Sequence, residues 1–547
     1  MKHRLTPHPP AAALRPHLPQ WAYGLEGDWL LRHQAAGLAA LAASAPKFSI
    51  LSARVAAWGF ERAPLDPALA AAAREAGRPL NDAPARRALT RELARRLVRP
   101  ANAHILAPLA QAPDPGPALA FLAPAMDDPR HGLYWRGKAF ALALSRRLPE
   151  LARQAVAPLL ADPVLTSLGA RLALEAALAW DGPAAWQATL SRLDRDCFPR
   201  YAALAQAHLL AEAGQREAAA EVLATLWREE NWHPDLTARL AALLAPPPAA
   251  DLSALPGALH VFVYTWNRAA LLRPTLERLA ESRLGPARVT VLDNGATDDT
   301  AAVCRAMAEH FAPGRFACLS LPINVGAPAA RNWLARVAGL GSDDLAAYLD
   351  DDALVAPDWL EQLAGALAAD PEADVAGARV VADAPGAARI AQSADVRLLP
   401  PDETHVVRPL VNVGPGPDLG LLAVVRPCAS VSGCCHLLRS RALTGLAPPF
   451  DIRFSPSQFD DLARDLAGFI AGRRAVYVGT AAVAHRQHAG PAQAKSAAAV
   501  GQLLGARAKL DGLFSRQAME QAAARDLDLA WAALAEAFAT VGQRLRD

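Results

Sequence analysis

The stretch LHVFVYTWNRAALLRPTLERLAESRLGPARVTVLDN, residues 259–294, has the pattern of a strand, a helix and a second strand. Val, Phe, Tyr and Leu dominate residues 259–264 and 288–292, and leucines recur at three- to four-residue spacing between them, over residues 270–282. Short apolar runs separated by an amphipathic helix are typical of neighbouring parallel strands. The stretch therefore predicts an α/β domain whose mostly parallel sheet is covered by helices.

The same alternation continues along the chain, and it predicts helices over 298–311 and 328–337 and strands over 316–321 and 345–349. Ligands of open parallel sheets bind beyond the carboxyl ends of the strands, so the residues after each strand are the informative ones. Polar residues and one glycine follow the four predicted strands: Thr265, Asn267 and Arg268; Asp293 and Asn294; Asn324 and Gly326; Asp350, Asp351 and Asp352. We expect these residues to meet at one crevice.

Three consecutive carboxylates end an apolar strand in AAYLDDDALV, residues 346–355. They repel one another and resist the loss of water unless a cation compensates them. Oxygen ligands of this kind suit Mg²⁺ or Mn²⁺, which bind one or two carboxylates and then the phosphates of a substrate. The triplet predicts a divalent-metal site, and the alternative is an acidic, solvated turn before a helix.

The end of the second strand, VLDNGATDDT at residues 291–300, combines a turn with a binding candidate. Asn-Gly is a turn signal, and residues 297–299 can cap the next helix. Asp293 comes directly after the strand, where its carboxylate could accept hydrogen bonds from a nucleotide base or ribose.

Composition divides the chain at APPPAADLSALPG, residues 245–257, where prolines and small residues interrupt a long helical pattern. We assign the parts as follows: an all-α domain at 1–245, a linker at 246–257, an α/β domain at 258–490 and a C-terminal helical extension at 491–547. Residues 201–244 resemble a tetratricopeptide-type helical repeat, whose period is about 34 residues. Either a helical repeat that binds a protein partner or a plain helical packing domain fits this pattern.

Charge and cysteine usage narrow the classes of partner. The 56 basic and 54 acidic residues nearly cancel, so nothing in the net charge asks for nucleic acid or an acidic membrane. Six cysteines without CxxC spacing fit a reducing compartment better than a disulfide framework or a zinc site. No uncharged apolar run approaches the roughly 18 residues of a spanning helix, so we expect a cytoplasmic protein without a membrane span.

Eight stretches resemble, in order and spacing, the family 2 glycosyltransferases with the GT-A fold, over residues 259–488. They are VYTWNR (263–268), VLDNGATDDT (291–300), NVGAPAARN (324–332), YLDDDALVAPDWL (348–360), SGCCHLLRSRAL (432–443), PPFDIRF (448–454), FDDLARDL (459–466) and VYVGTAAVAH (476–485). The resemblance implies an inverting enzyme that moves a sugar from a nucleotide-diphosphate sugar with the help of Mn²⁺ or Mg²⁺. It leaves the acceptor open among proteins, polysaccharides and lipid-linked molecules.

The resemblance also implies roles for individual residues. Asp350 and Asp352 would form the family's Asp-x-Asp pair, with Asp352 as the direct metal ligand, and His485 would assist in binding the metal or the diphosphate. Asp461 would be the catalytic base. The donor would be bound by the strand-end residues: Thr265, Asn267, Arg268, Asp293, Asn324, Asp350 and Asp351.

Three assignments around the predicted base stay open. Arg331 lies about one turn into a helix that faces the crevice, where it could support a diphosphate, or it could be a surface arginine. Asp460 stands where the family usually has Glu, and it could instead serve the helix terminus. Asp465, one helical turn after Asp461, is the second choice for the base.

Two other functional classes remain as alternatives. One is a nucleotidyltransferase, which shares the carboxylate and metal chemistry but releases pyrophosphate. The other is a catalytically weak scaffold that binds partners through its helices, against which the intact acidic residues argue. No GxGxxG follows the first strand, which argues against a dehydrogenase. Residues 385–427 show no decodable motif and are expected to form an irregular loop on the acceptor side.

Overall fold

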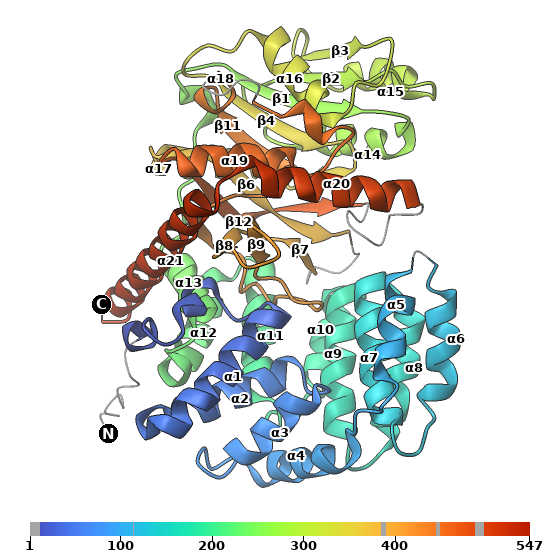
Figure 1. Ribbon diagram of the computed structural model, residues 1–547, viewed down its shortest axis with the longest axis vertical. Helices are drawn as coiled ribbons and strands as arrows, with labels where there is room; N and C mark the ends of the chain where they lie inside the picture. Colours follow the sequence, from blue (N-terminus) through green and yellow to red (C-terminus); the bar gives the residue numbers. More distant parts are fainter. Residues whose placement is uncertain (1–10, 113, 384–389, 445–448, 487–496, 547) are drawn as a thin grey trace.

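The computed structural model describes residues 11–112, 114–383, 390–444, 449–486 and 497–546. Figure 1 shows a helical part built from the first half of the chain and, beside it, a sheet with its covering helices. The C-terminal helices run along the sheet and down to the helical part. Within the described ranges, no helix has the length and apolar character needed to cross a membrane.

Among the residues described before β1, there are thirteen α-helices, and most successive helices pack on one another. They are α1 (Asp28–Ser44), α2 (Ser49–Arg62), α3 (Pro67–Ala76), α4 (Pro84–Arg96), α5 (Leu106–Gln111), α6 (Gly116–Ala125), α7 (Gly132–Arg146), α8 (Pro149–Ala161), α9 (Thr166–Trp180), α10 (Pro183–Leu190), α11 (Pro199–Glu212), α12 (Arg216–Glu230) and α13 (Pro234–Leu244). Six of them begin at a proline, whose fixed φ and missing N–H suit the first helical position. The predicted all-helical part is confirmed.

The sheet has the strand order β10-β12-β6-β11-β4-β1-β2-β3. The strands are β1 (Leu259–Thr265), β2 (Arg288–Asp293), β3 (Phe316–Ser320), β4 (Leu345–Asp350), β6 (Ala373–Ala382), β10 (Val425–Cys428), β11 (Cys435–Arg439) and β12 (Arg474–His485). The first four strands are parallel, while β11 lies antiparallel between β4 and β6. A mostly parallel sheet is therefore confirmed.

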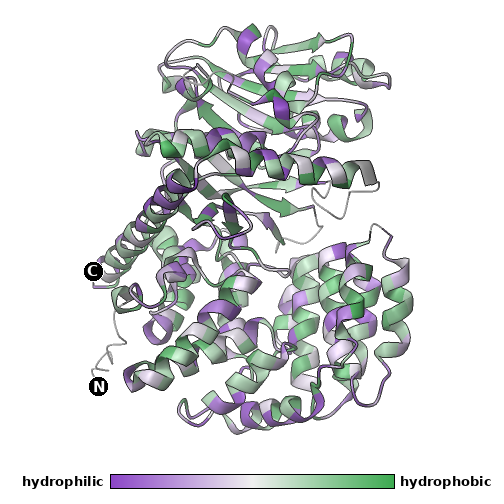
Figure 2. Cartoon of the chain, in the orientation of Figure 1, coloured by the Kyte–Doolittle hydropathy of each residue, from purple (hydrophilic) through white to green (hydrophobic). Residues whose placement is uncertain are grey.

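Helices cover both faces of this sheet. In β1, Val261 and Val263 pack with α14 (Ala269–Glu281), α15 (Thr300–Ala308) and α17 (Trp359–Ala369). Phe262, whose side chain alternates to the other face, packs with α16 (Ala327–Ala338). Figure 2 shows the central strands as mostly hydrophobic, as expected for strands buried on both faces.

The expectation of an irregular loop over residues 385–427 is wrong. This segment contains β7 (Ala391–Ser393), β8 (Val396–Leu399) and β9 (Arg408–Val411), and the strand β10 begins at its end. The strands β8 and β9 pair antiparallel as a separate two-stranded sheet. Three or four residues are too few to establish an alternating pattern, so sequence periodicity did not reveal them.

The C-terminal extension consists of α20 (Ala497–Leu513) and α21 (Arg516–Arg544). Helix α21 contacts α13 of the helical part and β8 and β10 of the α/β part. The Trp531 indole donates a hydrogen bond to the Pro19 carbonyl at 2.9 Å. The extension therefore packs on both parts of the chain, which the sequence had left open.

Buried polar contacts join the helical part to the α/β part. Asp235, at the start of α13, accepts hydrogen bonds from the Leu25 N–H at 2.6 Å and from the Asn412 amide at 3.1 Å. The predicted linker lies between the last helix, which ends at Leu244, and β1. Because buried polar groups are costly unless they are paired, these contacts favour one arrangement of the two parts.

A buried glutamate belongs to the same joint. Glu26 is 6% exposed and accepts a hydrogen bond from Arg62 at 2.6 Å. Burial raises the pKa of Glu26 to about 7, with the opposing attraction of Arg62 only partly offsetting it. The His233 ring lies beside it, and its Nδ1 accepts the Leu236 N–H, so the neutral ring carries its proton on Nε2. Because the Nδ1 lone pair accepts this backbone N–H and Nε2 carries the proton, the neutral His233 ring offers no free lone pair to a metal.

Glu26 should make stability depend on pH. Because its folded pKa is raised, the folded state binds more protons than the unfolded state, and stability falls as pH rises toward about 7. A difference of one in pKa between the folded and unfolded states corresponds to about 1.4 kcal/mol of unfolding free energy. Glu26→Gln should therefore gain Tm relative to the wild type between about pH 5 and about pH 8. The exposed Glu309→Gln is the control, and equal pH profiles for both variants would contradict the assignment.

Candidate active site

A cavity of about 1120 Å³ opens at the carboxyl ends of β1 and β4. Most of the predicted strand-end residues line it, and Arg331 of α16 (Ala327–Ala338) does so too: the strand-end residues are Thr265, Arg268, Asn294, Asn324, Gly326, Asp350, Asp351 and Asp352. Asp461 and His485 line it as well, from the first turn of α19 (Asp460–Ile470) and the end of β12. The expected convergence of separate strand ends on one crevice is therefore present for these residues.

Two predicted donor-binding residues are not among those that line the cavity. The Asp293 carboxylate is buried and accepts the Ala296 N–H at 2.8 Å. The Asn267 side chain accepts the Thr297 N–H at 2.7 Å, and its own backbone has a φ of 53°. Both residues thus hold the loops around the cavity, and their contact with a donor stays a prediction.

The three carboxylates of the triplet have different partners. Asp350 accepts a hydrogen bond from the Tyr264 hydroxyl at 2.8 Å. Arg268 donates to Asp351 at 3.1 Å and to Asp352 at 3.4 Å. Burial raises the pKa of Asp351 to about 6, against the opposing charge of Arg268. Burial likewise raises the pKa of Asp350. The site therefore holds more buried negative charge than its neighbouring arginines neutralise.

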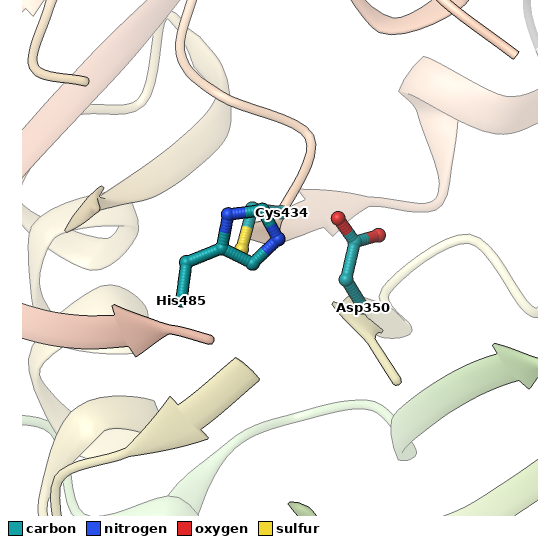
Figure 3. Close-up of side chains that lie close together, drawn as sticks. All are labelled: Asp350, Cys434 and His485. Atoms are coloured by element: carbon teal, nitrogen blue, oxygen red, sulfur yellow. The ribbon is translucent and has the colours of Figure 1, made fainter. Parts of the chain in front are cut away.

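Asp350, Cys434 and His485 present ligand atoms that all lie within 4.8 Å of one another. In Figure 3 the His485 imidazole lies beside Cys434 and extends toward the Asp350 carboxylate. His485 Nε2 is 3.0 Å from Asp352 Oδ1. Burial lowers the pKa of His485, but the hydrogen bond and charge of Asp352 outweigh it and leave the pKa raised.

These side chains fit a divalent cation. Asp352 Oδ1 is buried, and His485 Nε2 lies close to it at 3.0 Å. Two carboxylates and an imidazole are donors that a divalent metal accepts. Burial raises the pKa of the Cys434 thiol well above its usual range, so it stays protonated and is a poor ligand for a hard cation. No metal-ligand spacing in the sequence indicated that Cys434 would lie here.

Arg331 is buried in the wall of the cavity, so its alternative as a surface arginine is wrong. Its guanidinium donates to Asp460 at 2.6 Å and to the Tyr264 hydroxyl at 2.7 Å, and lies 3.7 Å from Asp350. Asp460 is 2% exposed and its carboxylate pairs with Arg331, so this ion pair, rather than a capping box, engages its side chain. The ion pair joins α16 to α19.

The carboxylate of Asp461 is held by backbone groups. It accepts the Gly433 N–H at 2.7 Å and the Leu462 N–H at 2.8 Å. A side chain at Gly433 would bring its Cβ within 2.4 Å of Asp461 Oδ2, so only glycine allows this approach. The preceding residue Phe459 has a φ of 67°, a left-handed conformation that costs energy for a bulky residue and is typical of functional sites.

Asp465, the second choice for the base, does not line the cavity. It is buried, pairs with Arg464 at 2.5 Å and accepts a hydrogen bond from the Ser430 hydroxyl at 2.7 Å. These contacts engage both carboxylate oxygens of Asp465 in packing α19 against the chain around Ser430. Of Asp460, Asp461 and Asp465, Asp461 is therefore the residue whose carboxylate a bound substrate can contact without breaking an ion pair.

The sheet order, the acidic triplet and the facing acidic helix define a GT-A-type glycosyltransferase domain. Residues 260–416 match the family described as glycosyl transferase family 2. The chain thus carries a glycosyltransferase domain of that family. A comparison with curated proteins found no match.

A comparison with solved structures found matches that include three complexes with a nucleotide or a nucleotide sugar. GalNAc-T7 with UDP, GalNAc and Mn²⁺ is 13% identical at a TM-score of 0.35, over 43% of this chain and 46% of the other, less than half its length. The mannosyltransferase PcManGT from Pyrobaculum calidifontis, with GDP-Man and Mn²⁺, is 18% identical at a TM-score of 0.35. This match covers 58% of this chain and 87% of the other. S. aureus TarS 1-349 with UDP-GlcNAc is 15% identical at a TM-score of 0.33. This match covers 50% of this chain and 73% of the other. Such likeness says nothing about the substrate of this chain.

The buried pair of Arg331 and Asp460 should be costly to break. Arg331→Met leaves Asp460 buried without its partner, and such losses cost about 3 to 5 kcal/mol. Urea denaturation should show this loss, and Arg331→Met with Asp460→Leu should recover part of it. Arg336→Met changes an exposed arginine of the same helix and should stay within about 0.5 kcal/mol of the wild type. An equal effect of both single variants would contradict the buried ion pair.

Proposed function

We propose that this chain is an inverting glycosyltransferase that uses a nucleotide-diphosphate sugar, a divalent metal and Asp461 as base. The observation that carries the proposal is the convergence, in one cavity, of the acidic triplet, His485 and the Asp461 carboxylate. These groups come from β4, β12 and α19, so ordinary turn chemistry at one strand end does not account for them.

Asp350, Asp352 and His485 would hold the metal. A metal bound there would neutralise the negative charge on the departing nucleoside diphosphate. Mg²⁺ sites are built of oxygen ligands, so the imidazole nitrogen favours Mn²⁺ over Mg²⁺. Cys434 would line the site as a neutral side chain.

The donor would bind at the ends of β1, β2 and β3. Asn294 donates to Asn324 at 2.9 Å and accepts the Val325 N–H at 3.0 Å, which fixes two of these loops together. Arg268 is 40% exposed at its side chain and can turn from the triplet toward a diphosphate. Arg331, whose guanidinium is already engaged, would act by holding Tyr264 and Asp350 in place.

Asp461 would accept the proton of the attacking hydroxyl. Its two backbone donors hold the carboxylate at the cavity wall, and no salt bridge with the described residues engages it. Attack on the anomeric carbon from the side opposite the departing diphosphate gives inversion in a single displacement.

Asp461→Asn removes the basicity and keeps the size of the side chain. General-base catalysis contributes about 10² to 10⁴ in rate, so transfer should fall by that range. Donor affinity should change by less than about tenfold, or 1.4 kcal/mol, because the base acts during attack. Steady-state transfer and donor binding separate the two effects. Asp343→Asn, which changes an exposed carboxylate outside the cavity, is the control, and near-native transfer by Asp461→Asn would contradict the assignment.

Asp352→Asn tests the metal site without relying on activity. Mn²⁺ with UDP or GDP should raise the Tm of the wild type. At a ligand concentration one hundred times Kd, the free energy of unfolding should rise by about 2.7 kcal/mol. The variant, or the wild type with a chelator, should lose this metal-dependent increase. Asp343→Asn changes an exposed carboxylate outside the cavity and should keep it. A full metal-dependent increase in Asp352→Asn would remove that residue from the site.

A further inference from the structure

The cavity has a charged half and an uncharged half. Its charged lining residues all belong to the triplet, to Arg268 and Arg331, to His485 or to the first turn of α19. A second wall of the cavity is formed by residues of β7, β8, β9 and α20 together with Leu462 of α19, and its members include Val396, Pro409, Val411, Gln502 and Leu503. This second wall carries amide, hydroxyl and apolar groups, with no lysine, arginine, aspartate or glutamate among its described members.

Helix α20 presents one face to the cavity. Gln502 and Leu503 lie three and four residues after Ala499, so the three residues share a side of the helix, and all three line the cavity. Leu504, the next residue, is 65% exposed and lies outside the lining. Leu503 therefore faces the cavity, whereas the adjacent Leu504 faces the exposed surface.

The helix is fixed against the catalytic part of the chain. Ala506 and Leu510 are buried in one apolar cluster with Leu462, the neighbour of Asp461. Asp511 accepts the Val406 N–H at 3.0 Å and the Val407 N–H at 2.8 Å, which ties α20 to the β8–β9 pair. Figure 1 shows α20 lying alongside α19. The uncharged wall thus begins directly beside the proposed base.

We propose that the space between α20 and the β8–β9 pair is the acceptor subsite, and that it takes a neutral sugar residue. The proposal rests on the glycosyltransferase function proposed above. A phosphate or carboxylate beside this wall would lose water without gaining a cationic partner among the described residues that form it, and Asp461 would repel it. A neutral sugar has an apolar ring face for Leu503 and Val411 and hydroxyls for the Gln502 amide.

The first test uses the wild-type full-length chain with Mn²⁺ and the nucleotide sugar that it turns over. Neutral p-nitrophenyl hexosides are compared with the same hexosides bearing a 6-phosphate and with the matching uronides. The expected result is a kcat/KM at least tenfold higher for a neutral acceptor. Equal or better use of the charged acceptors overturns the proposal, and so does donor turnover without transfer to any neutral hexoside. Absence of donor binding and turnover would count against the proposed function itself.

The second test uses adjacent variants. Leu503→Glu places a charge in the subsite and should raise the KM for the neutral acceptor at least tenfold, with a much smaller change in donor KM. Leu504→Glu places the same charge one residue away, on the exposed surface, and should leave the acceptor KM unchanged. Gln502→Ala should raise the acceptor KM several-fold. Because this variant introduces no charge, it tests the same subsite even if Leu503→Glu fails to fold. Equal acceptor KM values in the Leu503 and Leu504 variants would overturn the subsite.

Discussion

The arrangement of the site depends on the contacts of one buried group, the guanidinium of Arg331. It pairs with Asp460 at the start of α19 and donates to Tyr264 at the end of β1, and Tyr264 in turn donates to Asp350 at the end of β4. A buried cation costs several kcal/mol unless all its partners stay in place. The carboxylate of the proposed metal site and the helix that carries the proposed base are therefore held in one network.

A second buried network fixes the wall that faces the triplet. Arg397 of β8 pairs with Asp395 at 2.5 Å and with Asp526 of α21 at 3.1 Å, and Arg426 of β10 pairs with Asp395 at 2.6 Å. Helix α21 also packs on α13. The C-terminal extension and the helical part thus hold β8, which lines the cavity, in place. On this reasoning the parts outside the matched domain shape what the cavity accepts.

Sequence periodicity predicted the first four strands and their helices, because each is long enough to show its pattern, and most of the predicted strand-end residues do line the cavity. It could not predict contacts between distant residues, such as Arg331 with Asp460, 129 residues apart. For the same reason it assigned Arg331 a surface alternative and Asp460 a capping one. Asp293 and Asn267 show a further limit, since position after a strand does not say whether a side chain turns to the ligand or to its own loop.

The adjacent residues Asp460 and Asp461 show how one sequence motif can divide two tasks. Asp460 is buried with a cation and fixes the helix, so its charge is committed to structure. Asp461 is held by two neutral backbone donors, which orient the carboxylate without placing a full positive charge against it. A cationic partner would stabilise the ionised form and weaken it as a proton acceptor. The requirement for glycine at position 433 follows from this solution, because the carboxylate is oriented by close approach of the backbone.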